Sequence, residues 1–219
     1  MATKGTPSLE AAFGILQQFA RRRSPAERCE LCSAELASQH PHLLDPTTRK
    51  VVCSCDACAL LFSGQSGARF KRVPRLIRLV PDFHLSDAQW ESLMIPINMA
   101  FFFHSSPEGK VIAMYPSPAG ATESLLSLES WNEIAQANHA IQQMEADVEA
   151  LLVNRVGHSR GFAAAEYYIL PIDQCFKLVG IIRQNWRGFS GGTEVWQQIS
   201  EFFAQLRRHA TVLGGRGNA

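Results

Sequence analysis

Two cysteine pairs, Cys29-Glu-Leu-Cys32 and Cys55-Asp-Ala-Cys58, decide how this chain of 219 residues is organised. Each pair has the C-x-x-C spacing of a tight knuckle, which directs two sulfurs at one point. Two such knuckles close a tetrahedron of thiolates, the arrangement that holds zinc and that also suits iron. The sequence therefore predicts a metal site with four ligands: Cys29, Cys32, Cys55 and Cys58.

The same stretch offers more donor atoms than a tetrahedral site needs. Cys53 lies two residues before Cys55, and His40 and His42 lie two residues apart in the segment between the pairs. A site of three cysteines and His42 is the main alternative, and Cys53 can replace one of the predicted ligands. Taken singly, each histidine is more simply explained as a polar residue of a hairpin.

The residues around the cysteines predict a small treble-clef-like module. After the first knuckle, a turn at 46–49 and a returning strand at 50–53 indicate a hairpin. From Cys55 onward the sequence is typical of a helix start, with Asp56 in the first turn. A helix N-terminus favours thiolate over thiol, which lowers the cost of deprotonating the ligands.

Turn and loop signals in the sequence divide the chain into four segments. We expect a tail with an amphipathic helix over Leu9–Arg23 in residues 1–25, and the metal module in residues 26–66. An α+β domain follows over residues 67–210, and residues 211–219 form a disordered tail. The run Ser63-Gly-Gln-Ser-Gly67 marks the edge of the module.

The larger segment predicts an antiparallel sheet with helices on one face. Capping boxes at Ser86–Gln89 and Ser130–Glu133 open two helices. A last helix begins at Thr193 and carries one apolar stripe. Strands are expected at 97–104, 110–115, 148–156, 163–170 and 178–186. Together with the module, these elements predict an α+β fold.

Charge is unevenly distributed, although the formal net charge is only +1. Residues 21–78 hold 11 Lys and Arg against 5 Asp and Glu, whereas residues 79–219 hold 9 against 14. Basic residues between Arg69 and Arg78 alternate with apolar ones, which fits either a basic binding surface or an edge strand with solvated charges. No aromatic stacking platform accompanies them, so nucleic-acid binding is the weaker interpretation.

The sequence favours a cytoplasmic protein that does not enter a membrane. No apolar run approaches the ~20 residues that cross a bilayer. The apolar segment 9–20 precedes Arg21-Arg-Arg23, the reverse of the order in a secretory signal. Clustered cysteines free to bind metal suit a reducing compartment.

No catalytic residue is predicted. The sequence contains no phosphate-binding glycine loop and no H-E-x-x-H helix, and no nucleophile elbow is predicted. A site of four sulfurs has no open coordination position for Lewis-acid chemistry. The sequence therefore gives no positive case for an enzyme, and no cofactor beyond the metal.

Several stretches, taken with the cysteine segment, resemble a known family. They include His42-Leu-Leu-Asp45, Ala100-Phe-Phe-Phe103, Tyr115-Pro-Ser-Pro-Ala-Gly-Ala-Thr-Glu123, Leu170-Pro-Ile-Asp173 and Trp186-Arg-Gly-Phe189. Over about residues 27–209 the chain is similar to uncharacterised bacterial proteins that tend to be encoded beside [NiFe]-hydrogenase structural and maturation genes. The resemblance implies an accessory role with a protein partner, such as a hydrogenase subunit or a maturation factor. It implies no reaction.

The leading hypothesis is a non-enzymatic accessory protein whose zinc module stabilises a docking surface. The alternative is a rubredoxin-like electron carrier with iron in the same four sulfurs. Against it, rubredoxin-like knuckles usually carry Gly after the second cysteine of each pair, whereas Ser33 and Ala59 follow here. A nucleic-acid-binding zinc protein is the third possibility.

Overall fold

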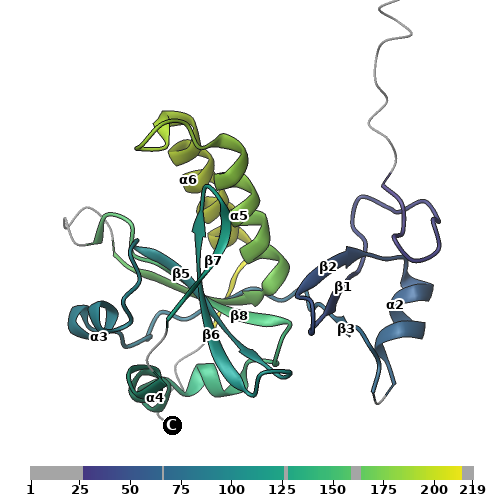
Figure 1. Cartoon of the computed structure of the whole chain (residues 1–219), viewed down its shortest axis with the longest axis horizontal. Coiled ribbons are helices and arrows are strands. Elements are labelled where there is room, and N and C mark those ends of the chain that lie inside the picture. Colours follow the sequence, from purple (N-terminus) through teal and green to yellow (C-terminus); the bar gives the residue numbers. More distant parts are fainter. Residues whose placement is uncertain (1–26, 66, 126–127, 159–163, 214–219) are drawn as a thin grey trace, which may run out of the picture.

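The computed structural model describes residues 27–65, 67–125, 128–158 and 164–213. Within them, a small cysteine-rich module lies to one side of a larger α+β domain (Figure 1). The helix expected over Leu9–Arg23 lies outside the described residues. In the described part of the chain, no helix is long and apolar enough to cross a membrane.

The module is a three-stranded sheet and one helix. Strands β1 (His42–Asp45) and β2 (Lys50–Cys53) form an antiparallel hairpin, and β3 (Lys71–Arg72) pairs with the other edge of β1. Helix α2 (Asp56–Ser63) follows β2. The core of the module is very small. It consists of the buried side chains Leu43, Val52 and Ala59, with Leu31 and Phe70 partly buried against them.

The domain is built on a seven-stranded sheet with the order β10-β4-β9-β8-β5-β6-β7. Every pairing is antiparallel except the parallel pair of β10 and β4. The strands are β4 (Arg78–Leu79), β5 (Met99–Ser105), β6 (Lys110–Ser117), β7 (Gly120–Ser124), β8 (Glu149–Asn154), β9 (Glu166–Pro171) and β10 (Thr211–Val212).

Helices cover both faces of this sheet. On one face pack α5 (Ile172–Asn185) and α6 (Gly192–His209), which lie side by side in Figure 1. On the other face pack α3 (Asp87–Ser92), α4 (Leu128–Ala137) and the 3₁₀ helix η1 (His139–Gln143). The predicted α+β class is confirmed, but the prediction that helices cover one face is too simple.

Strand β5 explains the second helical layer. Successive side chains of a strand point to opposite faces, so Phe101 and Phe103 enter the core under α5 and α6. Phe102 points the other way and stacks on Trp131 of α4, with ring centroids 4.9 Å apart. An unbroken aromatic run therefore needs cover on both sides.

Two local predictions are wrong. The segment 178–186, predicted as a strand, belongs to helix α5, because Ile172, Cys175, Leu178 and Ile182 recur at helical spacing and are all buried. The segment 211–219, assigned to a tail, begins with β10, in which Thr211 pairs with Arg78. The capping box at Ser86 is present as predicted.

Candidate metal centre

The structure brings the two cysteine pairs together. The Sγ atoms of Cys29, Cys32, Cys55 and Cys58 all lie within 4.8 Å of one another, an arrangement that can hold a metal ion. Cys29 and Cys58 are buried, whereas Cys32 is exposed. The cluster therefore lies at the surface of the module, with part of its sulfur shell reaching solvent.

The first knuckle is a tight turn closed by backbone hydrogen bonds. The Cys29 N–H donates to the Ala34 carbonyl at 2.8 Å, and the Ser33 N–H donates to the Cys29 carbonyl at 2.8 Å. Ser33 has a φ of 64°, in the left-handed region, which turns the chain back directly after Cys32. Ser33 stands at the position that carries Gly in rubredoxin-like knuckles, and it adopts the left-handed conformation that glycine favours.

The second pair lies at the start of helix α2. Cys55 is the N-cap residue, and its Sγ accepts a hydrogen bond from the Cys58 N–H at 3.5 Å. Sulfur therefore takes the place of the oxygen that usually caps a helix. The helix N-terminus and its free N–H groups stabilise negative charge on these sulfurs.

The sulfur separation fits a tetrahedral ion rather than a disulfide. Cys32 Sγ and Cys55 Sγ lie 3.7 Å apart, and all six cysteines are free. Two sulfurs bound to one zinc at about 2.3 Å each lie about 3.8 Å apart in a tetrahedron. A disulfide would need about 2.05 Å.

Crowding of the four sulfurs shifts their pKa values in opposite directions. Burial disfavours the Cys29 thiolate, but hydrogen bonds from the backbone of Cys55, Cys32 and Leu31 outweigh it and lower the pKa of Cys29 to about 6. Burial, together with the neighbouring thiols, raises the pKa of Cys58 to about 12. One thiolate forms easily and then opposes the next, so a cation is what allows all four to ionise.

The first knuckle is fixed to the hairpin through Glu30. Its N–H donates to the Cys53 carbonyl at 2.9 Å, and its carboxylate accepts the Cys53 N–H at 2.9 Å. Lys50 donates to the same carboxylate. The hydrogen bond from the Cys53 backbone, followed by that from Lys50, lowers the pKa of Glu30 although burial opposes the shift. These contacts set how the two knuckles face each other.

The two alternative ligands do not join this cluster. His42 and Cys53 instead form a second group with His40, in which one ligand atom of each residue lies within 4.8 Å of the others. The sequence singled out all three residues but did not predict that they meet. The signal was available in the pattern, because the predicted hairpin places His42 and Cys53 on neighbouring strands.

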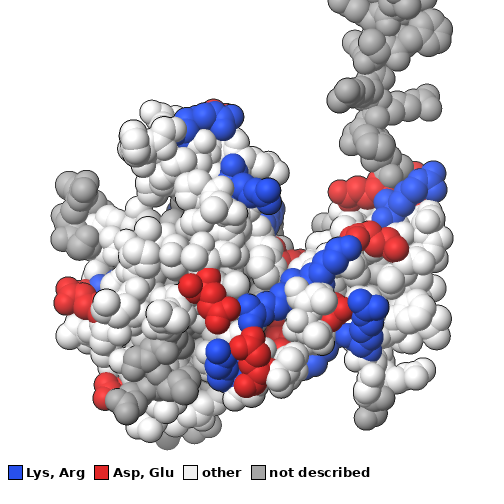
Figure 2. Space-filling view, in the orientation of Figure 1, with Lys and Arg blue, Asp and Glu red and all other residues white. Residues whose placement is uncertain are grey.

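The basic segment between Arg69 and Arg78 is largely paired with acidic side chains. Arg69 contacts Asp45 at 3.0 Å, Lys71 contacts Asp147 at 2.7 Å and Arg78 contacts Glu149 at 2.6 Å. Figure 2 shows Lys and Arg side chains along the seam between module and domain, with Asp and Glu beside them. This pairing leaves a weaker basic surface than the sequence suggests.

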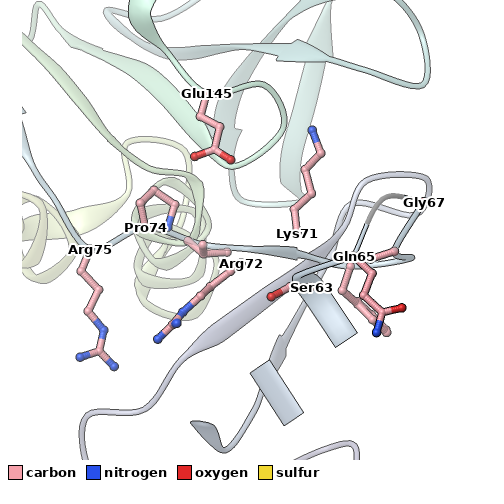
Figure 3. Close-up of a pocket in the computed structure, with 11 residues that line it drawn as sticks. Ser63, Gln65, Gly67, Lys71, Arg72, Pro74, Arg75 and Glu145 are labelled. Atoms are coloured by element: carbon pink, nitrogen blue, oxygen red, sulfur yellow. The ribbon is translucent and has the colours of Figure 1, made fainter. Parts of the chain in front are cut away.

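A pocket of about 690 Å³ lies beside this segment. In Figure 3, Lys71 points toward the domain, the side from which Glu145 comes, whereas Arg72 and Arg75 point the opposite way. Arg72 is 4.0 Å from Asp56, and Arg75 is exposed. The pocket is therefore lined by three basic side chains and one acidic side chain, and because Lys71 is paired with Asp147, its remaining charge is weakly positive.

Comparison with known proteins agrees with the resemblance in its coarse form. A model described as a family of unknown function, DUF5947, matches residues 28–210, so the chain belongs to this family. No curated protein and no solved structure matches the chain. The match spans both the module and the domain.

Proposed function

We propose that this member of the DUF5947 family is a non-enzymatic accessory protein that carries a structural zinc ion and docks to a protein partner. The observation that carries the proposal is the convergence of four cysteine sulfurs within 4.8 Å at the start of α2. Four thiolates complete the tetrahedral shell of zinc and leave no open position. The metal then serves the fold of the module rather than a reaction.

The size of the module core supports a structural role for the metal. Three buried apolar side chains, Leu43, Val52 and Ala59, are too few to stabilise an independent unit. A structural zinc site in a small module contributes ~10–16 kcal/mol to folding. The metal is therefore the largest stabilising term available to this part of the chain.

Helix α2 offers the docking surface. Leu60, Leu61 and Phe62 are 69%, 61% and 40% exposed, although all three are large and apolar. They begin two residues after Cys58 in the same helix, so the metal cluster fixes the helix that presents them. Exposed apolar side chains that lie next to one another often mark a site of interaction with another protein, whereas single ones are common on any surface.

The partner that we propose is a [NiFe]-hydrogenase subunit or maturation factor. This part of the proposal rests on the sequence resemblance alone. An apolar docking helix is compatible with such a partner, because folding or unassembled subunits expose apolar surface.

Metal analysis with an absorbance spectrum tests the metal. Full-length protein purified without oxygen is expected to contain zinc and to show no visible band. Cys32→Ser should lose the zinc held by the four cysteines, whereas Cys175→Ala, a thiol control in the domain core, should keep it. Iron with thiolate charge-transfer bands would instead support the electron carrier. Protein that binds no metal with its thiols reduced would contradict the proposal.

Binding to purified hydrogenase subunits and maturation proteins of the same organism tests the docking surface. Leu60→Ser with Leu61→Ser should weaken binding, because both side chains are exposed and their loss should leave the fold intact. Met94→Ser, which removes an equally exposed apolar side chain from the domain, is the matched control. Equal loss of binding in both variants would argue against α2 as the docking helix.

A further inference from the structure

A second cluster of metal-ligating residues lies on the hairpin, apart from the four cysteines. It consists of His40, His42 and Cys53, and one ligand atom of each lies within 4.8 Å of the other two. The β1–β2 register explains the meeting, because His42 and Cys53 are direct partners across the antiparallel pair. Partners of this kind place their side chains on the same face of the sheet. His40, two residues before His42, reaches that face as well. The two imidazole rings meet edge to face, with their centroids 5.0 Å apart.

Both histidine rings are held by their Nδ1 atoms. His42 Nδ1 lies 2.5 Å from Oδ2 of Asp173 in the first turn of α5, and His40 Nδ1 lies 2.9 Å from the Ala37 carbonyl oxygen. Both partners are acceptors, so each Nδ1 carries the proton and donates it. The other nitrogen, Nε2, then has a free lone pair. A carboxylate or a carbonyl behind Nδ1 is the usual support of a histidine that binds metal through its far nitrogen.

The free lone pair of His40 has no partner in the protein. Its side chain is only 7% exposed, and within the described part of the chain its Nε2 is buried without a hydrogen-bond partner. Buried polar atoms are nearly always satisfied, so each exception calls for an explanation. A bound cation beside His42 and Cys53 satisfies this atom.

The cluster faces a pocket of about 490 Å³ between the module and the domain. Asp173 and Gln174 of α5 line its domain side, and Arg75 lines it as well. Oδ1 of Asp173 is buried and also lacks a hydrogen-bond partner among the described residues. The pocket therefore leaves room, with polar groups around it, for a further ligand to an ion at the cluster.

We propose that His40, His42 and Cys53 form a second metal site, which takes a divalent transition ion such as zinc or cobalt. Two imidazoles and one thiolate are donors that such ions prefer. Donors of this kind around one tetrahedral ion lie about 3.3–3.8 Å apart, so donor atoms that lie within 4.8 Å of one another need to close by at most about 1.5 Å. Three protein ligands leave one coordination position, which opens to the pocket and takes water or a group from a partner.

This site differs from the four-cysteine cluster in its consequence. The four cysteines all belong to the module, whereas the second site is supported by Asp173 of the domain. An ion there strengthens the hydrogen bond between His42 and Asp173, because metal binding makes the Nδ1–H a better donor. Occupancy of the second site therefore couples the hairpin to α5.

Metal stoichiometry of the full-length protein tests the proposal. Reduced protein is freed of metal with a chelator and is then titrated with Co²⁺ and, separately, with Zn²⁺. Native mass spectrometry gives the number of ions bound to each chain. Two ions are expected in the wild type and one in either His40→Gln or Cys53→Ser. His104→Gln removes an exposed histidine of β5 and should keep two ions. The cobalt spectrum of the four-cysteine site should survive in the two cluster variants, which shows that they have folded.

Asp173→Asn tests the support of His42. It should lower the affinity for the second ion by about 10- to 100-fold and leave the affinity for the first unchanged, as expected when a metal ligand loses its hydrogen-bonded carboxylate. A wild type that binds one ion with both metals would overturn the proposal. So would a second ion that remains in both His40→Gln and Cys53→Ser. Because loss of the first ion also loosens residues 29–58, the two ions are told apart by the cobalt spectrum of the four-cysteine site and not by a variant of its cysteines.

Discussion

The module and the domain are stabilised by different means. The module buries three apolar side chains around its own hairpin, whereas the domain buries aromatic and aliphatic side chains on both faces of its sheet. In the domain, Phe101, Phe102 and Phe103 are at most 2% exposed. In the module, Leu60 and Leu61 of α2 are mostly exposed.

This difference shows where each part obtains its free energy of folding. Buried apolar area is enough for a domain of this size, but a module of about 40 residues needs a metal, a disulfide or a neighbour. The module has a cluster that can hold a metal, and it has a neighbour. Its cysteines gather at one point, and its side chains Leu44 and Val73 extend into the core of the domain. Loss of metal should therefore destabilise the module most, the contacts between module and domain less, and the domain least.

The largest effect is expected from loss of the four-cysteine site. Cys58→Ser removes a buried cysteine of the cluster, and with it the ~10–16 kcal/mol that the proposed zinc contributes to folding of the module. Hydrogen exchange followed by mass spectrometry should show lost protection over residues 29–58 and unchanged protection in β5 and β8. Cys175→Ala should protect residues 29–58 as well as the wild type does. Equal loss of protection in β5 would contradict the division into two differently stabilised parts.

The same site has a definite pH dependence. Metal binding requires thiolates, and the pKa of Cys58 is raised to about 12 by burial and by the neighbouring thiols. Protons therefore compete with the metal, and the apparent affinity should rise with pH and fall on acidification. A zinc competition assay with a coloured chelator across the neutral range measures this slope. An affinity that does not change with pH would mean that the cysteines are not the ligands.

The next largest effect is expected in the domain core. Phe102→Ala removes a ring that is 1% exposed and that stacks on Trp131, so it should cost about 3–5 kcal/mol of unfolding free energy. Chemical denaturation followed by domain tryptophan fluorescence measures the loss. Phe62→Ala removes the same ring from the exposed face of α2, and should change stability by about 0.5 kcal/mol or less. Similar losses in both variants would show that α2 is covered by something in solution.

The contrast between the parts also explains what the sequence could predict. The four-cysteine site follows from spacing within two short motifs, so the ligands meet as soon as the knuckles form. The second cluster depends on register, because His42 meets Cys53 only when the hairpin turn has its observed length. Asp173 could not be predicted as a neighbour of His42, since 131 residues separate them.

The errors in the domain have a similar physical origin. Residues 178–186 are rich in β-branched and aromatic side chains, which favour a strand locally. The helix forms because Leu178, Val179 and Ile182 all face the sheet only at a period of 3.6 residues. Tertiary packing thus overrides local preference where an apolar run is short. The second layer of helices was not predicted, although three consecutive phenylalanines in one strand place apolar rings on both faces of the sheet.

A moderate effect is expected at the seam between the two parts. Asp147 is 3% exposed, lies 2.7 Å from Lys71 and accepts hydrogen bonds from the N–H and Oγ of Ser106. Asp147→Asn keeps the left-handed backbone, with φ 74°, that asparagine tolerates well. It removes the charge, and should cost about 1–3 kcal/mol.

The pH dependence of this contact has a sign that can be checked. Burial opposes ionisation of Asp147, but hydrogen bonds from Lys71 and Ser106 outweigh it and lower its pKa. A lowered pKa in the folded state means that the stabilisation is present above the unfolded value of about 3.9 and is lost as pH falls through the folded value. The wild type and Asp147→Asn should therefore differ in unfolding free energy at neutral pH and converge in acid. A constant difference down to pH 2 would contradict this assignment.

The smallest effect is expected at the tip of the hairpin. Arg49, in the turn between β1 and β2, contacts Glu123 of β7 at 3.1 Å and also pairs with Glu108. The Glu123 side chain is 43% exposed, so solvent screens the pair, and a double-mutant cycle with Arg49→Met and Glu123→Gln should give about 0.2–1 kcal/mol. The coupling should shrink further in high salt. A larger coupling that resists salt would mean that this end of the hairpin is held rigidly to β7, and the domain would then stabilise the module directly, with less dependence on metal.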